Sequence, residues 1–101
     1  MQNPAKVDDI LAYSWGYDQT NVDWFKVTRV TSASVELTPI GKQYTETGFM
    51  SGETTPDPET VTGHPFMKRV LTYAAQPYVV SFDYGVGIPW DGRPKYESHY
   101  A

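Results

Sequence analysis

Three aspartates have the clearest potential for chemistry in this sequence: Asp18, Asp23 and Asp91. A pair of carboxylates can hydrolyse a glycoside when the fold places them at the required separation, whatever their spacing along the chain. Against such an enzyme, a chain of 101 residues has little room for a deep and desolvated cleft. We therefore expect a protein without catalytic activity, and a small hydrolase with Asp18 or Asp23 as its base is an alternative.

Other catalytic and cofactor chemistry has no supporting pattern. The only histidines, His64 and His99, stand far apart, and the chain has no cysteine for a thiolate metal site or a disulfide. Ser98 precedes His99, but adjacent side chains on an extended strand point to opposite faces. The glycines of residues 85–92 lie among helix breakers, which makes a phosphate loop unconvincing. We expect no metal and no cofactor.

Two clusters combine aromatic and polar side chains: SWGYDQTNVDW (residues 14–24) and IPWDGRPKYESHY (residues 88–100). In a structural interpretation, both are turns, with Gly16 and Asp18 shaping the first bend and Trp15 turned inward beside the other tryptophans. In a binding interpretation, the remaining polar and tyrosine side chains form a contact surface. The candidates in these clusters are Tyr17, Gln19, Asn21, Asp23, Arg93, Lys95 and Tyr96.

The formal net charge of −4 argues against general binding to duplex nucleic acid, because duplex binders present cationic stripes to phosphates. Three further acids, Glu53, Asp57 and Glu59, lie in a stretch without any basic residue. They form either a solvated acidic loop or a surface for a basic partner. A protein partner is favoured; binding of single-stranded nucleic acid or RNA through the aromatic and Arg/Lys side chains is the alternative.

The elements that must position these residues are mostly strands. Residues 23–40 alternate apolar and polar side chains in two β-branched runs, which predicts an antiparallel hairpin with its turn at residues 31–34. Pro39 is expected to mark a strand end or an edge. Residues 67–73 and 78–84 predict a second pair around AAQP, with Tyr78, Val80, Phe82 and Tyr84 on one face of their strand.

Less regular segments complete the chain. Residues 7–13 could begin a short helix capped by Asp8 or Asp9, or form an edge strand. The Gly-, Thr- and Pro-rich residues 46–65 predict a long loop with one short strand at most, around residues 47–52. We expect residues 1–101 to form a single mainly β domain, with five or six antiparallel strands in a small barrel or strongly bent sheet and at most one short helix.

The segments SWGYDQTNVDWFKVTRVTSASVELTPI, GHPFMKRV and PWDGRPKYESHYA resemble a group of small, poorly characterised proteins of bacteriophages and mobile elements. The paired SWGYDQTN and WDGxPxYxSxYA patterns carry the resemblance. It implies an accessory protein in the cytoplasm of a bacterial host. From this context and the acidic charge, we expect binding and inhibition of a host protein complex such as a CRISPR or other defence nuclease, in the manner of an anti-CRISPR protein. We expect no membrane association, and either a monomer or a homodimer is compatible with the sequence.

Overall fold

The computed structural model describes residues 3–16, 20–73 and 76–98. The described residues form antiparallel strands and contain no helix, so the predicted mainly β class is confirmed. Within these described ranges the strands number eight rather than five or six. They are β1 (Ile10–Trp15), β2 (Asn21–Val30), β3 (Ser34–Gly48), β4 (Ser51–Val61), β5 (Phe66–Tyr73), β6 (Gln76–Phe82), β7 (Gly85–Pro89) and β8 (Lys95–Ser98).

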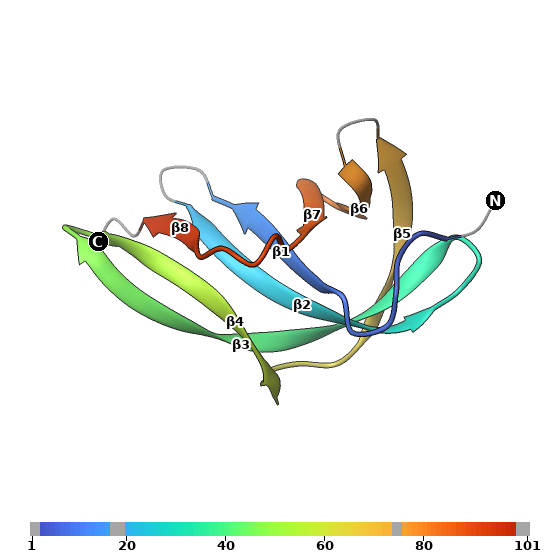
Figure 1. The fold of residues 1–101 in the computed structure, drawn as a ribbon, viewed down its shortest axis with the longest axis horizontal. Helices are drawn as coiled ribbons and strands as arrows, with labels where there is room; N and C mark the ends of the chain where they lie inside the picture. The colour runs from blue at the N-terminus through green and yellow to red at the C-terminus, as the bar shows by residue number, and fades with distance from the viewer. Residues whose placement is uncertain (1–2, 17–19, 74–75, 99–101) are drawn as a thin grey trace.

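Six of the strands close into a barrel-like ring. The sheet order is β2-β1-β7-β6-β5-β3-β4-β8, and β2 pairs with β3 as well, which joins β1, β2, β3, β5, β6 and β7 around a common interior. Closure leaves few long strand edges exposed, which is how a small all-β chain limits unpaired backbone groups. Figure 1 shows β5, β6 and β7 gathered at one side of this ring, opposite the β3–β4 arm.

The long strand β3 serves both halves of the molecule. One of its sides pairs with β5 through Ser34–Leu37 and then with β4 from Ile40 onward, while the other side pairs with β2. Pro39 lies at this change of partner and the strand continues through it, so of the two predicted possibilities, a strand end or an edge, the strand end is wrong. The carbonyl of Pro39 accepts a hydrogen bond from the Thr62 amide at 3.0 Å. The nitrogen of Pro39 points to the same edge of the strand, where β3 changes partner, so its missing N–H leaves no ladder hydrogen bond unmade.

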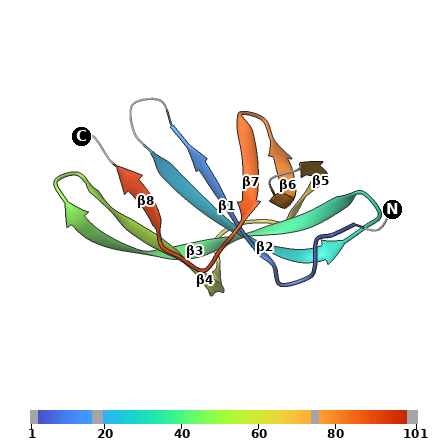
Figure 2. The ribbon, with the colours of Figure 1, turned by 45° about the horizontal axis from the view of Figure 1, so that its top comes forward.

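The loop predicted over residues 46–65 is instead part of a hairpin between β3 and β4, with Phe49 and Met50 in the turn. The loop was predicted because this segment is rich in proline, which usually interrupts a strand. β8 pairs with β4 only between Ser51 and Thr54, so Pro56 and Pro58 lie where β4 has a free edge and no donor is required. The curved hairpin and β8 form the arm that extends from the ring in Figure 2.

Strands β1 and β2 are covered on both faces, because each contributes to two hydrophobic clusters. Within β2, Phe25 and Val27 face the ring interior, while Val22 and Trp24 face β4 and β8. This alternation follows from the two-residue period of a strand. Residues on the two faces of β2 therefore belong to different cores.

Both predicted hairpins are confirmed: β2 pairs with β3, and β5 pairs with β6. Tyr78, Val80 and Phe82 share the ring-facing side of β6, whereas Tyr84 lies in the turn after it and is 94% exposed. The ambiguous segment over residues 7–13 contains the start of strand β1, which has neighbours on both sides and is no edge. The sequence did not predict β7 and β8.

Candidate functional site

An open hollow of about 580 Å³ lies at one end of the ring, at the end of β1 and the turn before β7. We call it the aromatic hollow; it is lined by Tyr13, Ser14, Trp15, Gly16, Asp23 and Tyr84. The SWGYDQTN segment thus contributes one wall. Gly16 has a φ of 133°, a conformation that other residues rarely adopt, which confirms its predicted role in the bend.

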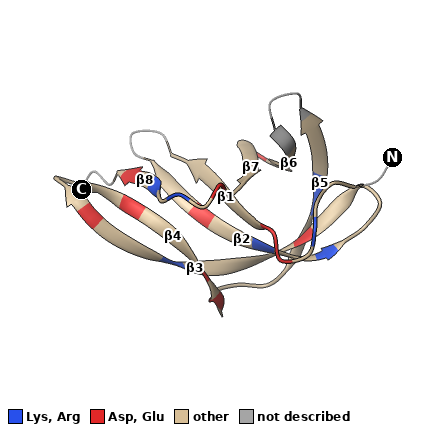
Figure 3. Ribbon diagram, in the orientation of Figure 1, with Lys and Arg blue, Asp and Glu red and all other residues tan. Residues whose placement is uncertain are grey.

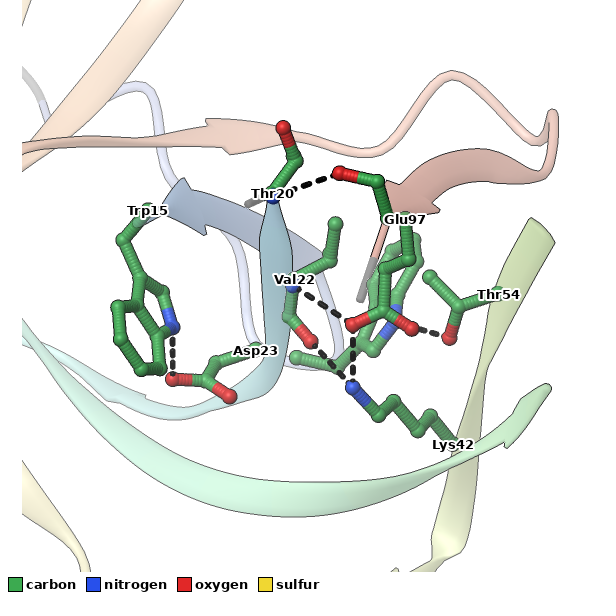
Figure 4. A network of polar contacts seen from close by, with 9 residues as sticks. Trp15, Thr20, Val22, Asp23, Lys42, Thr54 and Glu97 are labelled. Atoms are coloured by element: carbon green, nitrogen blue, oxygen red, sulfur yellow. Dashed lines mark hydrogen bonds and ion pairs between the residues drawn. The ribbon is translucent and has the colours of Figure 1, made fainter. Parts of the chain in front are cut away.

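Trp15 is held on the outside of the molecule by a side chain of the next strand. Its indole Nε1 donates a hydrogen bond to Oδ2 of Asp23 at 2.8 Å (Figure 4). The Trp15 side chain is 46% exposed, so the prediction that it turns inward is wrong. The reason is register: Trp15 is the last residue of β1, opposite Asn21, where the ring interior opens to solvent.

Tyr13 forms the inner wall of the hollow. Its ring stacks on Phe82, with centroids 4.4 Å apart and planes at 12°, and this contact joins β1 to β6 through the ring interior. Gly85 contributes by lacking a side chain, because a Cβ there would lie 3.3 Å from Cε1 of Tyr13. The position of Tyr13 is therefore set by packing, whereas that of Trp15 is set by a hydrogen bond.

Two of the first cluster's predicted contact residues, Tyr17 and Gln19, lie outside the described residues, as does Asp18. Asn21 and Asp23 lie on β2 and point to the same face as Tyr13 and Trp15, their partners across the ladder. The structure therefore brings Asp23 and the exposed Trp15 together. Sequence reasoning missed Tyr13 and Tyr84 as members of the hollow, because their positions depend on the ring closing through β7.

The second cluster is not brought to one surface. Arg93 lies in the turn before β8, where its amide donates to Asp91 Oδ1 at 3.0 Å and its carbonyl accepts the indole N–H of Trp90 at 2.6 Å. The Arg93 amide lowers the pKa of Asp91. Lys95 and Tyr96 are adjacent on β8 and point to opposite faces, with Lys95 on the side of buried Glu97.

The three acids of the predicted loop lie on strand β4. Glu53 is exposed and stands opposite Tyr96 of β8. Asp57 accepts hydrogen bonds from the Glu59 amide at 3.3 Å and from Thr60 Oγ1 at 2.8 Å, so its carboxylate shapes an irregular end of the strand. Glu59 is exposed beside it. Charges and prolines at the free edge of β4 discourage pairing with another chain.

The other two tryptophans form a contact beneath the arm. Trp24 is 2% exposed, and the Trp90 ring meets it edge to face at a centroid distance of 5.6 Å. The Trp24 indole N–H donates to Oγ1 of buried Thr54 at 3.2 Å. The predicted role in core packing is confirmed for Trp24 and Trp90, whereas Trp15 is exposed and lines the aromatic hollow.

A buried charge that the sequence did not reveal lies beside the second hydrophobic cluster, which consists of Ala12, Val22, Trp24 and Ile40. Glu97 is fully buried, and its Oε1 accepts hydrogen bonds from the Val22 amide at 2.9 Å and from Lys42 Nζ at 2.5 Å (Figure 4). Lys42 Nζ also donates to the Val22 carbonyl at 3.0 Å. We call this set the Lys42–Glu97 clamp. The clamp bonds the backbone of Val22 at both its amide and its carbonyl, so we assign it to stability rather than to ligand binding.

Comparison with protein-family models, with curated proteins and with solved structures finds no match to this chain. The resemblance to phage and mobile-element proteins therefore stays a prediction. Over the described ranges, no helix is long and apolar enough to cross a membrane. Within the same ranges, no three metal-ligating side chains lie close enough together to hold a metal ion.

Proposed function

We propose that this chain is a non-catalytic accessory protein of a phage or mobile element, which binds and inhibits a bacterial protein complex such as a CRISPR or other defence nuclease. The observation that carries the proposal is the aromatic hollow. It presents two exposed aromatic side chains, Trp15 and Tyr84, around the carboxylate of Asp23. Tryptophan and tyrosine are the side chains that most often dominate the binding energy of protein interfaces.

The charge of the molecule supports a partner with a basic surface. The net charge is −4, and exposed acidic residues occur on β2, β3 and β4, on the arm and the part of the ring next to it (Figure 3). Complementary charge accelerates association and suppresses wrong partners. Nucleases that hold nucleic acid in a cationic groove are one class of protein with such a surface.

Binding of single-stranded nucleic acid has less support from the geometry. Such sites combine stacking aromatic rings with a basic groove that follows the phosphates. Here the exposed rings of the hollow stand beside the carboxylate of Asp23, and the basic Lys95 and the aromatic Tyr96 point to opposite faces of β8. A protein partner fits this arrangement better.

The proposal can be tested in bacterial strains that each carry one defence nuclease. Expression of the chain should restore plaque formation by a phage that the defence blocks, and the purified chain should reduce cleavage by that nuclease. The double variant Trp15→Ala/Tyr84→Ala should lose both effects. Phe49→Ala is the matched control, because Phe49 is 86% exposed in the turn of the β3–β4 hairpin, away from the hollow.

Folding of each variant is checked by thermal unfolding. Failure to restore plaques in any strain, with the chain expressed and folded, would contradict the proposal. An equal loss of effect in the Phe49→Ala variant would show that the hairpin arm takes part in binding, and would contradict the assignment of the binding surface to the hollow alone.

A further inference from the structure

The aromatic hollow has a chemical character that goes beyond exposed apolar surface. Its lining includes the aromatic side chains of Tyr13, Trp15 and Tyr84, of which Trp15 and Tyr84 are exposed, and the carboxylate of Asp23. Aromatic faces carry partial negative charge and attract cations, most strongly when the ring is an indole. Both components of the site therefore favour a positively charged group.

The Asp23 carboxylate is available to such a group. Its Oδ2 accepts the Trp15 indole N–H, and within the described part of the chain its Oδ1 has no hydrogen-bond partner. The ion pairs of that part, Arg29–Glu36 and Lys42–Glu97, do not involve it. Among the residues that the structure describes, the Asp23 carboxylate thus lies beside the exposed rings of Trp15 and Tyr84 and forms no ion pair.

We infer that the aromatic hollow binds an arginine side chain of the partner protein. A guanidinium group is planar, stacks on aromatic faces and donates directional hydrogen bonds to a carboxylate, and it is more weakly hydrated than a lysine amine. Tyr84 and Trp15 supply faces for stacking, and Asp23 Oδ1 supplies the acceptor. This inference rests on the proposed function, because the partner must bring the arginine.

The turn that carries Tyr84 reinforces the selection of a cation. Asp83 precedes Tyr84 in the turn between β6 and β7, and both side chains are exposed. An exposed acid next to the rim adds to the local negative potential, although an exposed charge acts weakly in salt solution. The hollow therefore attracts a cation first by charge and then holds it by stacking.

Titration with argininamide, followed by NMR, tests the inference without the partner. The indole N–H signals of Trp15, Trp24 and Trp90 report on separate places, and loss of one signal in the Trp15→Phe variant assigns that of Trp15. Argininamide at millimolar concentrations should shift the Trp15 signal and leave the Trp24 signal in place. Citrullinamide, which has nearly the same shape and the same α-amine but a neutral urea in place of the guanidinium, should cause no comparable shift.

Variants distinguish a cation site from an apolar hollow. Asp23→Asn keeps an amide oxygen to accept the indole N–H but removes the charge, and it should weaken argininamide binding about threefold. Tyr84→Ala should weaken it by a similar factor, and Phe49→Ala should not change it. Equal shifts with citrullinamide, or unchanged binding in the Asp23→Asn variant, would overturn the inference.

The titration separates this inference from the proposed function. If argininamide leaves the Trp15 signal unchanged while Trp15→Ala/Tyr84→Ala still abolishes inhibition of a nuclease, the inference fails and the function stands. If argininamide binds as expected but no defence is inhibited, the cation site stands and the function fails. A short oligothymidine that shifts the Trp15 signal more than argininamide does would overturn the inference in favour of a nucleic-acid site.

Discussion

The side-chain amine of Lys42 lies 2.5 Å from Oε1 of Glu97 and joins β3 to β8 beside the start of β2. The β2–β3 ladder has its last pair at Trp24 and Ile40, after which the two strands separate. Val22 would otherwise lose partners on that side. The two charged side chains bond its amide and its carbonyl instead, so the clamp continues the sheet where the backbone ladder stops.

Replacing Lys42 with methionine should destabilise the fold strongly, because it leaves the buried Glu97 charge without its cation. Removing one partner of a buried pair costs about 3 to 5 kcal/mol. The Lys42 side chain is 35% exposed, so water moderates the loss and we expect about 2 to 4 kcal/mol in the free energy of unfolding. Chemical denaturation measures it.

Lys26→Met is the matched control, since Lys26 lies half-buried on β2 and has no ion pair within the described residues. Glu97→Gln removes the buried charge and keeps an acceptor for the Val22 amide, so it should cost less than Lys42→Met. A Lys42→Met variant that unfolds at the same denaturant concentration as Lys26→Met would contradict the assigned role of the clamp.

Thr54 supplies the acceptor for the buried Trp24 indole, so Thr54→Val should leave that N–H without a partner. Valine has nearly the shape of threonine, and the change therefore isolates the hydrogen bond. A buried donor that loses its acceptor costs about 1 to 3 kcal/mol. Thr55→Val, on the opposite face of β4 and half-buried, is the control and should change the unfolding free energy little.

Gly52 is buried under the ring of Tyr44, and alanine should not fit there. An added Cβ would lie 2.3 Å from the Thr45 carbonyl oxygen and 2.6 Å from Cζ of Tyr44. Overpacking of this kind costs about 1 to 3 kcal/mol, and the backbone oxygen cannot move away without disturbing the hairpin. Gly48→Ala in the same hairpin contacts only the Ser51 hydroxyl and should be nearly neutral. Equal thermal stability of the two variants would contradict the packing described for Gly52.

The β2–β3 hairpin could be predicted from the sequence because its apolar residues alternate and a ring interior buries one face of each strand. The β3–β4 hairpin gives no such signal. Its inward-facing residues include Lys42, Thr54 and the glycine at 52, since the second core is completed by a buried carboxylate. Polar residues that satisfy one another inside a fold look like solvent-exposed residues in a sequence.

Only part of the candidate site was predictable: of the residues that line the hollow, Asp23 was among the predicted contact residues. Asp23 and Asn21 were identified from residue type, yet the exposure of Trp15 depends on where β1 ends relative to β2. Tyr84 joins the site only because β6 and β7 close the ring. The burial of Glu97 could not be predicted for the same reason. It depends on the fold bringing Val22, Lys42 and β8 together.

The phenol of Tyr78 makes stability depend on alkaline pH. Tyr78 is 3% exposed, and its hydroxyl donates to Oδ2 of Asp9 at 2.6 Å. Burial, followed by this hydrogen bond and the charge of Asp9, raises the pKa of Tyr78 above its ordinary value of 10.0. The neutral phenol is thus favoured in the fold, and its stabilising contribution is complete below pH 10.

Above that pH the phenol ionises in the unfolded chain before it ionises in the fold, so stability should fall by up to about 1.4 kcal/mol per pH unit from this residue. Tyr78→Phe should lose the hydrogen bond at all pH values but show a shallower decline above pH 10. Tyr84→Phe, at a position 94% exposed, should decline as steeply as the wild type. Urea unfolding at successive pH values measures the slopes, and parallel curves for the wild type and Tyr78→Phe would contradict the contact with Asp9.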